Sequence, residues 1–325
     1  MRAGTTANRS RRLRIWAFRE AGVLGVLVVM GAGLTLATRT PGGSTFLSAG
    51  NLLDVARQFS FVAIMAVGEL FVILTGGIDL SVAAVLALAG VVMAKVMVGG
   101  AGTAAGIIVG LLTAVAVGAV NGALVVKARL PAFIATLGTL SVCRGLAYAV
   151  SRGHPISGMP KLFTQGIGQG TVLGVPVSVA VMVAITLFGW LLLARTRWGR
   201  YLYAVGGNEE AARFAGVPVG AAKILAYVLC AATAGISAIL MTAWLGTAQS
   251  TAMLGGELDV IAATVIGGAS LMGGVGTALG AVLGAAIMGV LRNGLVLLNC
   301  PAYYRDVSVG LVVVLAVAMD RLRKE

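Results

Sequence analysis

The sequence has little charge, a single histidine and few cysteines. Only 11% of its 325 residues are Asp, Glu, Lys or Arg, whereas soluble domains carry about 25%. Too few charged groups remain to cover a surface that faces water on all sides, which excludes an ordinary soluble fold. His154 is the one histidine, and Cys143, Cys230 and Cys300 lie far apart. This spacing fits no metal site and no disulfide framework, so we expect no metal.

The sequence also lacks the patterns of an enzyme. It contains no Gly-x4-Gly-Lys-Ser/Thr loop, whose backbone would cradle the phosphates of ATP. It has no Ser/His/Asp constellation and no paired carboxylates suited to a soluble pocket. We therefore expect no catalytic residue and no cofactor in this chain.

Apolar residues, in contrast, are abundant and occur in long runs. They make up 59% of the sequence, and its mean hydropathy is +1.00. A lipid core needs roughly 20 apolar residues per helix, and helices satisfy their own backbone hydrogen bonds there. The sequence predicts an all-α, polytopic membrane helical bundle of about ten spans. The predicted limits are 21–37, 52–75, 79–98, 103–126, 131–150, 176–194, 223–245, 257–271, 277–298 and 303–320.

The basic residues indicate how the bundle sits in the membrane. Six arginines precede the first apolar run, in a basic tail at 1–20, and three basic residues lie at 321–324 in the tail 321–325. With a single membrane domain at 21–320, the predicted cytoplasmic segments hold 16 of the 24 Lys and Arg residues. Basic residues accumulate on the cytoplasmic side and attract anionic lipid. We therefore expect both termini in the cytoplasm, an interaction with membrane lipid and no nucleic-acid partner.

The longest polar segment between spans, at about 195–223, contains signals for a short surface helix. Asn208 is a good N-cap, and Glu209 and Glu210 suit the positive end of the helix dipole. Ala211, Ala212, Arg213 and Phe214 continue the helix. Gly216 suits a left-handed C-terminal position, and Pro218 prevents continuation. A helix of two turns is not stable alone. It either packs on its own protein or docks on a partner through Phe214.

This loop resembles the coupling loop of permeases in bacterial ATP-binding-cassette (ABC) sugar importers of the ribose type. Other stretches resemble that family in the same order, over roughly residues 50 to 320. They are Leu74-Thr-Gly-Gly-Ile-Asp-Leu-Ser81, Arg129-Leu-Pro-Ala-Phe-Ile-Ala-Thr-Leu-Gly-Thr139, Glu257–Gly274, Asn293-Gly294-Leu295 and Tyr303-Tyr304.

The resemblance implies an inner-membrane permease with a fold like that of type II importers, which imports a monosaccharide or similar polyol. It implies a cytoplasmic ABC ATPase that docks at the 208–216 helix and a periplasmic or lipid-tethered sugar-binding protein. A second permease copy or a paralogue would complete the path. Because the phosphate-binding loop is absent, ATP would be hydrolysed by the partner chain.

Polar residues within spans are candidates for function, because burying them in lipid is costly. Glu69 either bonds a neighbouring helix or lines the path. Asp79 and Ser81 either cap the span at 79–98 or contact the solute. Asn121 and Asn293 either line a path or bridge helices. Glu257 and Asp259 suit the start of a helix, and Arg144 and Arg292 either snorkel or pair internally.

Three other functions compete with sugar import. A related importer permease for nucleosides or branched-chain amino acids would share the loop and the topology. An ion-driven secondary transporter would need no docking helix but a midplane carboxylate, for which Glu69 is the candidate. A membrane-embedded enzyme is the third alternative.

Overall fold

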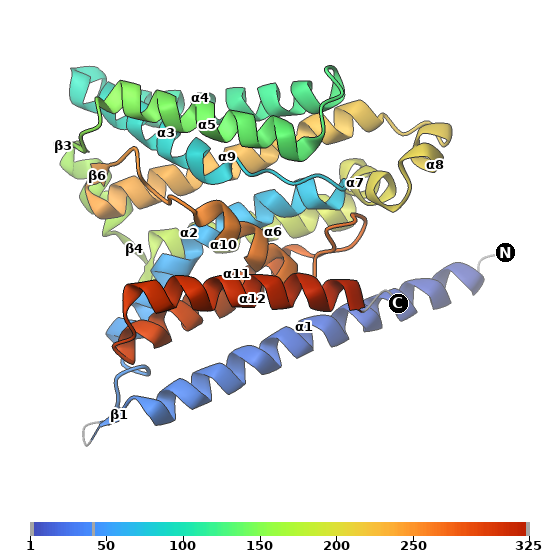
Figure 1. Cartoon of the computed structure of the whole chain (residues 1–325), viewed down its shortest axis with the longest axis horizontal. Helices are drawn as coiled ribbons and strands as arrows, with labels where there is room; N and C mark the ends of the chain where they lie inside the picture. Colours follow the sequence, from blue (N-terminus) through green and yellow to red (C-terminus); the bar gives the residue numbers. More distant parts are fainter. Residues whose placement is uncertain (1–2, 41–42, 323–325) are drawn as a thin grey trace.

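The structure is a computed structural model that describes residues 3–40 and 43–322. Its helices run roughly side by side in a bundle (Figure 1). The α-helices are α1 Ala3–Ala37, α2 Ala49–Leu74, α3 Val82–Val96, α4 Gly102–Val126, α5 Ala132–Ser151, α6 Val177–Arg195, α7 Arg197–Gly207, α8 Glu209–Phe214, α9 Val219–Leu245, α10 Gly256–Ile266, α11 Ala278–Leu297 and α12 Ala302–Leu322. Two π-helical turns, η1 Met97–Ala101 and η2 Leu162–Gly168, lie between them.

Short antiparallel strand pairs close some of the loops. Within the described residues, β1 Arg39–Thr40 pairs with β2 Gly43–Ser44, and β4 Thr171–Val172 pairs with β5 Val175–Pro176. The third pair joins distant loops: in β3 Ile156–Ser157 and β6 Thr247–Ala248, Ile156 faces Ala248. The sequence analysis did not predict these strands, which are too short to leave a pattern.

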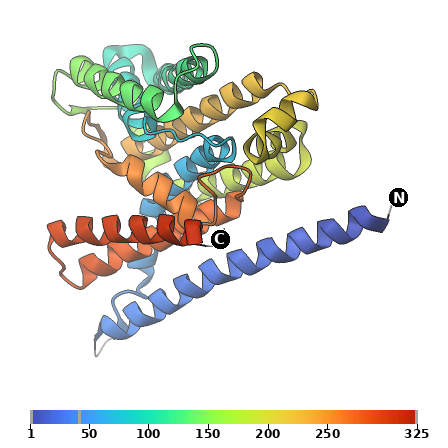
Figure 2. The ribbon, with the colours of Figure 1, turned by 45° about the vertical axis from the view of Figure 1, so that its right-hand side comes forward.

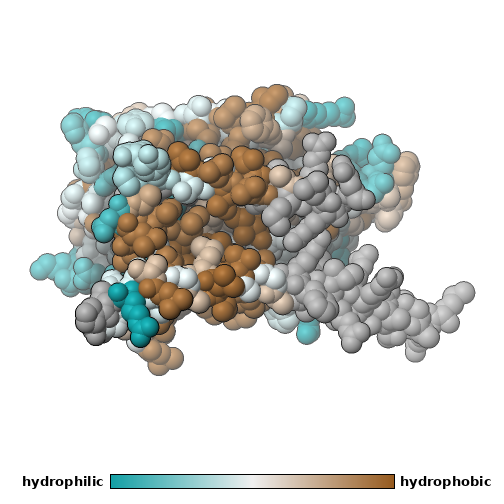
Figure 3. Space-filling view, turned by 60° about the horizontal axis from the view of Figure 1, so that its bottom comes forward, coloured by the Kyte–Doolittle hydropathy of each residue, from teal (hydrophilic) through white to brown (hydrophobic). Residues whose placement is uncertain are grey.

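Seven helical segments of the described residues are long and apolar enough to cross a membrane. They are Glu20–Ala37, Ala49–Leu74, Val82–Val126, Ala132–Ser151, Val177–Arg195, Val219–Leu245 and Ala278–Leu297. Figure 3 shows apolar surface across the middle of one face and hydrophilic residues toward its ends. The prediction of a polytopic helical membrane protein is confirmed, whereas this number does not support about ten spans.

Two regions explain much of the difference in number. Val82–Val126 is counted once but holds α3 and α4, which pack against each other, with Gly106 beside Met97 and Gly110 beside Ala89. The predicted span 257–271 is not one continuous helix, because α10 ends at Ile266. Its 11 residues extend roughly 16 Å at 1.5 Å per residue, about half of a lipid core. Gly268, with φ at +94°, leads the chain away from the helix.

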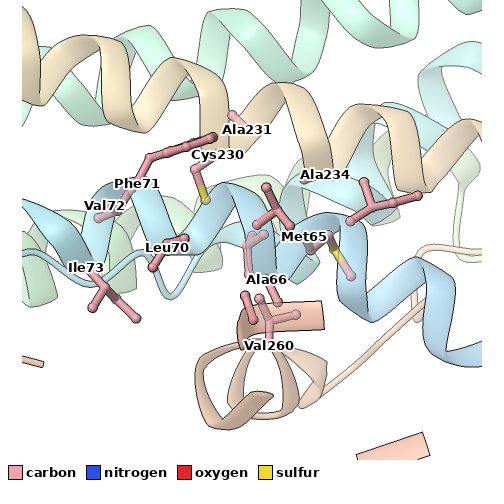
Figure 4. Packing of buried hydrophobic residues seen from close by; sticks show 14 of the residues in the cluster. Met65, Ala66, Leu70, Phe71, Val72, Ile73, Cys230, Ala231, Ala234 and Val260 are labelled. Carbon is pink, nitrogen blue, oxygen red and sulfur yellow. The ribbon is translucent and has the colours of Figure 1, made fainter. Parts of the chain in front are cut away.

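The core lies around α2, which packs against α6, α7, α9, α10 and α11. Figure 4 shows side chains of α2, among them Met65 and Leu70, between Ala231 of α9 and Val260 of α10. Small residues allow the neighbouring helices to approach closely. On α4, glycine or alanine recurs every four residues on the buried face, at Gly106, Gly110, Ala114, Gly118 and Gly122. Such stripes are typical of helix packing in membranes.

Different elements lie at the two ends of the bundle. The N-terminal end of α1 and the C-terminal end of α12 lie at the same end of the molecule as α7 and α8 (Figure 1). β1, β3 and β6 lie at the opposite end. α1 packs against α11 and runs along the edge of the bundle, with its N-terminal half extending past the other helices (Figure 2).

Candidate functional site

The surface helix that the sequence predicts is present as α8. The side-chain oxygen of Asn208 accepts a hydrogen bond from the backbone N–H of Ala211 at 2.9 Å, which caps the helix. At the other end Gly216 has a φ of +78°, and its N–H donates to the carbonyl of Arg213 at 3.0 Å. Both helix ends therefore agree with the sequence-based prediction.

α8 buries one side chain and exposes a much larger one. Ala212 is buried, and α8 contacts α7 and α9. Phe214 is 91% exposed. Full burial of a phenylalanine side chain stabilises by about 1.5–3 kcal/mol. The described residues do not bury Phe214, so this stabilisation is absent in the chain alone. α8 is thus seated on its own protein through Ala212, while Phe214 is available to a partner.

Ion pairs hold α8 in place. Lys223 of α9 donates to Glu209 Oε2 at 2.6 Å, and Arg213 Nη2 donates to Glu209 Oε1 at 3.1 Å. The hydrogen bond from Lys223 is the main reason why the pKa of Glu209 lies below its usual value. Glu210 is exposed. Glu209 therefore joins α8 to the first turns of α9.

The sequence analysis missed α7, which precedes α8. The hydroxyl of Thr196 caps it by accepting from Gly199 N–H at 3.2 Å, and Leu202 and Val205 are buried. Their spacing of three residues was the available signal. Tyr203 of α7 donates from its hydroxyl to the carbonyl of Gly276 at 2.7 Å.

Four predicted residues meet in a buried network between α2, α3 and α4. Glu69 and Asp79 are 0% and 1% exposed, and Ser81 and Asn121 are equally buried. Glu69 Oε1 accepts from the backbone N–H of Asp79 at 2.9 Å. Asp79 Oδ1 accepts from the backbone N–H of Ser81 at 2.8 Å and from its hydroxyl at 2.6 Å. Asn121 Nδ2 donates to Ser81 Oγ at 2.9 Å.

This network connects helices. Ser81 occupies the N-cap position of α3 but makes no side-chain capping bond, so its hydroxyl does not act as the cap that was one of the two alternatives. Asp79 does accept a free N–H at the start of α3. Cys230 of α9 lies 3.4 Å from Glu69 Oε2 and adds a fourth helix. Neither carboxyl forms a salt bridge with a described residue. The geometry favours helix bridging for these residues.

Asn293 lies apart from Asn121, with which the sequence analysis grouped it. Its Nδ2 donates to Asn51 Oδ1 at 2.8 Å, and Asn51 Nδ2 donates to Asn293 Oδ1 at 3.2 Å. This reciprocal amide pair joins α11 to α2. Arg144 also bonds internally, because its Nη1 donates to the carbonyls of Ser250 and Ala252.

A cavity of about 250 Å³ lies between α2, α9, α10 and α11. On its wall, Arg292 Nη2 donates to both carboxylate oxygens of Asp259, at 2.8 and 2.6 Å. Internal pairing was one of the two alternatives for Arg292, but its partner could not be identified from the sequence, because the two residues lie on different helices. In the described residues, no group of three or more His, Cys, Asp or Glu is placed to hold a metal ion.

A bundle of several apolar spans with a partly polar cavity between its helices is typical of membrane transport proteins. Comparison with known proteins then gives the family. Residues 51–317 match the family model described as branched-chain amino acid transport system / permease component. The match covers more than half of the chain, so the chain belongs to this family.

Individual relatives are similar over almost their whole length. The ribose import permease protein RbsC of Escherichia coli K12 is 39% identical over 330 residues, with 100% of both chains covered. The D-allose transport system permease protein AlsC of the same strain is 38% identical over 278 residues, 85% of each chain. The L-arabinose ABC transporter permease protein AraH of Azospirillum brasilense is 34% identical over 312 residues, 95% of this chain and 90% of AraH. The prediction that the chain is a transport permease and not an enzyme is confirmed.

Proposed function

We propose that this chain is the permease subunit of an ATP-driven importer for a monosaccharide or similar small polyol. The similar permeases are named for ribose, D-allose and L-arabinose, which favours a sugar. The family description names branched-chain amino acids, so an amino acid is the alternative. An external binding protein would deliver the solute, and a second permease copy or a paralogue would complete the path.

The observation that carries the proposal is the geometry of α8. A cytoplasmic ABC ATPase that covers Phe214 would bury an aromatic side chain that is 91% exposed in the chain alone. Asn208 and Gly216 fix the two ends of α8, and Glu209 ties it to α9 through Lys223. Such a short, anchored helix suits the transfer of a movement from the ATPase to the spans. An ion-driven transporter would have no use for it.

We also propose that the chain crosses the membrane ten times in all, with both termini in the cytoplasm. The packing of α3 against α4 supports two crossings within Val82–Val126. The loop after α10 reaches the end of α2, where Gly274 N–H donates to the carbonyl of Leu74 at 3.0 Å, which supports a crossing made of half a helix and a loop. α12 supplies the last crossing. A reporter that is active only outside the cytoplasm, fused to Glu325, should stay dark.

Reconstitution tests the transport function. Proteoliposomes with this chain and its ATPase, ATP inside and binding protein outside, should accumulate labelled D-ribose, D-allose or L-arabinose. Uptake should stop when either partner is omitted. Uptake of labelled leucine in place of every sugar would contradict the sugar assignment. Sugar uptake driven by an ion gradient without the ATPase would contradict the importer class.

A further inference from the structure

The cavity between α2, α9, α10 and α11 has an aromatic side. Phe59 and Phe61 of α2 and Trp244 of α9 line it, and the ring centroids of Phe61 and Trp244 lie 5.7 Å apart. Aromatic faces attract the C–H face of a pyranose ring, because that face is apolar while the hydroxyl groups project around the ring edge. This side of the cavity therefore suits a flat, partly apolar ligand.

The other side of the cavity is polar and held in place before a ligand arrives. Gln58, Asp259, Arg292 and Asn293 line it. Asp259 is 7% exposed, whereas the side chain of Arg292 is 48% exposed. The pair thus extends from a buried carboxylate to a guanidinium that solvent can reach. Charged, planar groups held in position make strong and directional hydrogen bonds, and vicinal hydroxyl groups match them.

The volume of the cavity also points to a small organic ligand. At about 250 Å³ it is far larger than the roughly 10–15 Å³ that one water needs. It lies just below the roughly 300–1,000 Å³ of pockets for drug-sized molecules. A salt bridge that only clamps α10 to α11 would need neither the rings nor this space.

We propose that this cavity is a binding site for one monosaccharide within the permease. The sugar ring lies against Trp244 and Phe59, and its hydroxyl groups bond Asp259, Arg292 and Gln58. The inference rests on the proposed function and deepens it: the permease recognises the transported sugar itself, in addition to the recognition by the external binding protein.

Trp244 offers a direct measurement of binding. The chain has four tryptophans, and Trp190 and Trp198 lie outside the cavity. In the variant Trp16→Phe/Trp190→Phe/Trp198→Phe, Trp244 is the only tryptophan. The full-length variant, in lipid nanodiscs without binding protein, is titrated with D-ribose, D-allose, L-arabinose and, as a control, leucine. We expect a saturable change of Trp244 emission with at least one sugar and none with leucine.

Two acidic residues of α10 provide a matched pair for this titration. Asp259→Asn should weaken sugar binding by roughly tenfold or more, as expected when a hydrogen bond to a charged group is lost. Glu257→Gln, two residues earlier and outside the cavity, should leave it unchanged. Melting curves show whether each variant is folded. If Asp259→Asn fails to fold, the titration with an intact Asp259 still decides.

The result that overturns this site is distinct from failure of the proposed function. The single-tryptophan variant is also assayed for sugar uptake with its ATPase and binding protein. If it imports sugar while no sugar changes Trp244 emission, the cavity is not a sugar site and the importer function stands. If it imports leucine and no sugar, both proposals fail. An equal loss of affinity in Glu257→Gln and Asp259→Asn also contradicts the assignment.

Discussion

α8 and the α2–α3 junction both depart from the usual burial of apolar residues and exposure of charged ones. α8 exposes an aromatic side chain, whereas the junction buries two carboxyls. On α8 an aromatic side chain, Phe214, is 91% exposed. At the α2–α3 junction two carboxyls, Glu69 and Asp79, are almost fully buried. The carboxyls have hydrogen-bond partners within the chain, whereas the aromatic ring has no comparable surroundings among the described residues. The buried carboxyls connect helices within the chain, whereas the exposed ring of Phe214 is the surface that we propose for the ATPase.

The largest effect is expected where the buried network is broken. Asp79→Leu removes the acceptor for the backbone N–H and the hydroxyl of Ser81. Unsatisfied buried groups cost about 1–3 kcal/mol each, so stability should fall by about 3 kcal/mol or more, as melting in detergent would reveal. Asp54→Leu, at the exposed start of α2, should have little effect. Equal melting of Asp79→Leu and wild type would show that the network does not stabilise the fold.

The exposed ring should matter for assembly and not for folding. Phe214→Ala should weaken ATPase binding by about 2 kcal/mol, roughly thirtyfold, and reduce uptake, with an unchanged melting temperature. Leu202→Ala, in the buried face of α7, should instead lower the melting temperature. A pull-down with the ATPase, beside melting curves, separates the two effects. Unaltered ATPase binding and uptake in Phe214→Ala would refute the coupling role.

A smaller effect is expected at the end of α8. Gly216 has a φ of +78°, and a Cβ there would meet no atom within 4 Å. The cost of Gly216→Val is therefore conformational, roughly 1–2 kcal/mol. It should displace Phe214 and weaken ATPase binding by less than Phe214→Ala. Gly216→Asn should cost less, because asparagine tolerates the left-handed region. Equal binding by Gly216→Val and wild type would show that this turn does not position the ring.

The ion pairs of Glu209 should have the smallest effect and a defined pH dependence. Because the pKa of Glu209 is lowered in the folded protein, its pairing stabilises α8 above the usual pKa of glutamate and loses this contribution as pH falls through the lowered value. Exposed pairs contribute about 0.2–1 kcal/mol. The melting difference between wild type and Glu209→Gln should be small at pH 7 and should disappear as pH falls through the lowered pKa of Glu209. A difference that grows with acidity would contradict this.

Features encoded by neighbouring residues were predictable from the sequence. The apolar runs indicated a polytopic helical membrane protein, and Asn208 and Gly216 marked both ends of α8. These signals are local, since a cap involves residues three or four apart. The spacing of Leu202 and Val205 in α7 was also visible but was obscured by the glycines and aromatic residues around it.

Features created by packing were not predictable in this way. The pairing of Asp259 with Arg292 depends on how α10 lies against α11, and Asn293 meets Asn51 across 242 positions. The length of α10 was misjudged because residues 267–271 contain neither a charged residue nor a proline, and hydropathy does not report where a helix stops. Gly268 ends it by adopting a φ of +94°. The cavity follows from these contacts and has no sequence signature of its own.

Gly206, next to the last residue of α7, has a mechanical consequence. A Cβ at residue 206 would overlap the carbonyl oxygen of Leu74 and the amide nitrogen of Gly274, so three backbones touch there with no side chain between them. Side chains change rotamer and absorb strain, whereas a hydrogen-bonded backbone does not. α7 contacts α8, and the loop that holds Gly274 follows α10, which carries Asp259. If the ATPase docks at Phe214 as proposed, a displacement of α8 would meet this close backbone contact and would pass with little loss to α10, which lines the cavity.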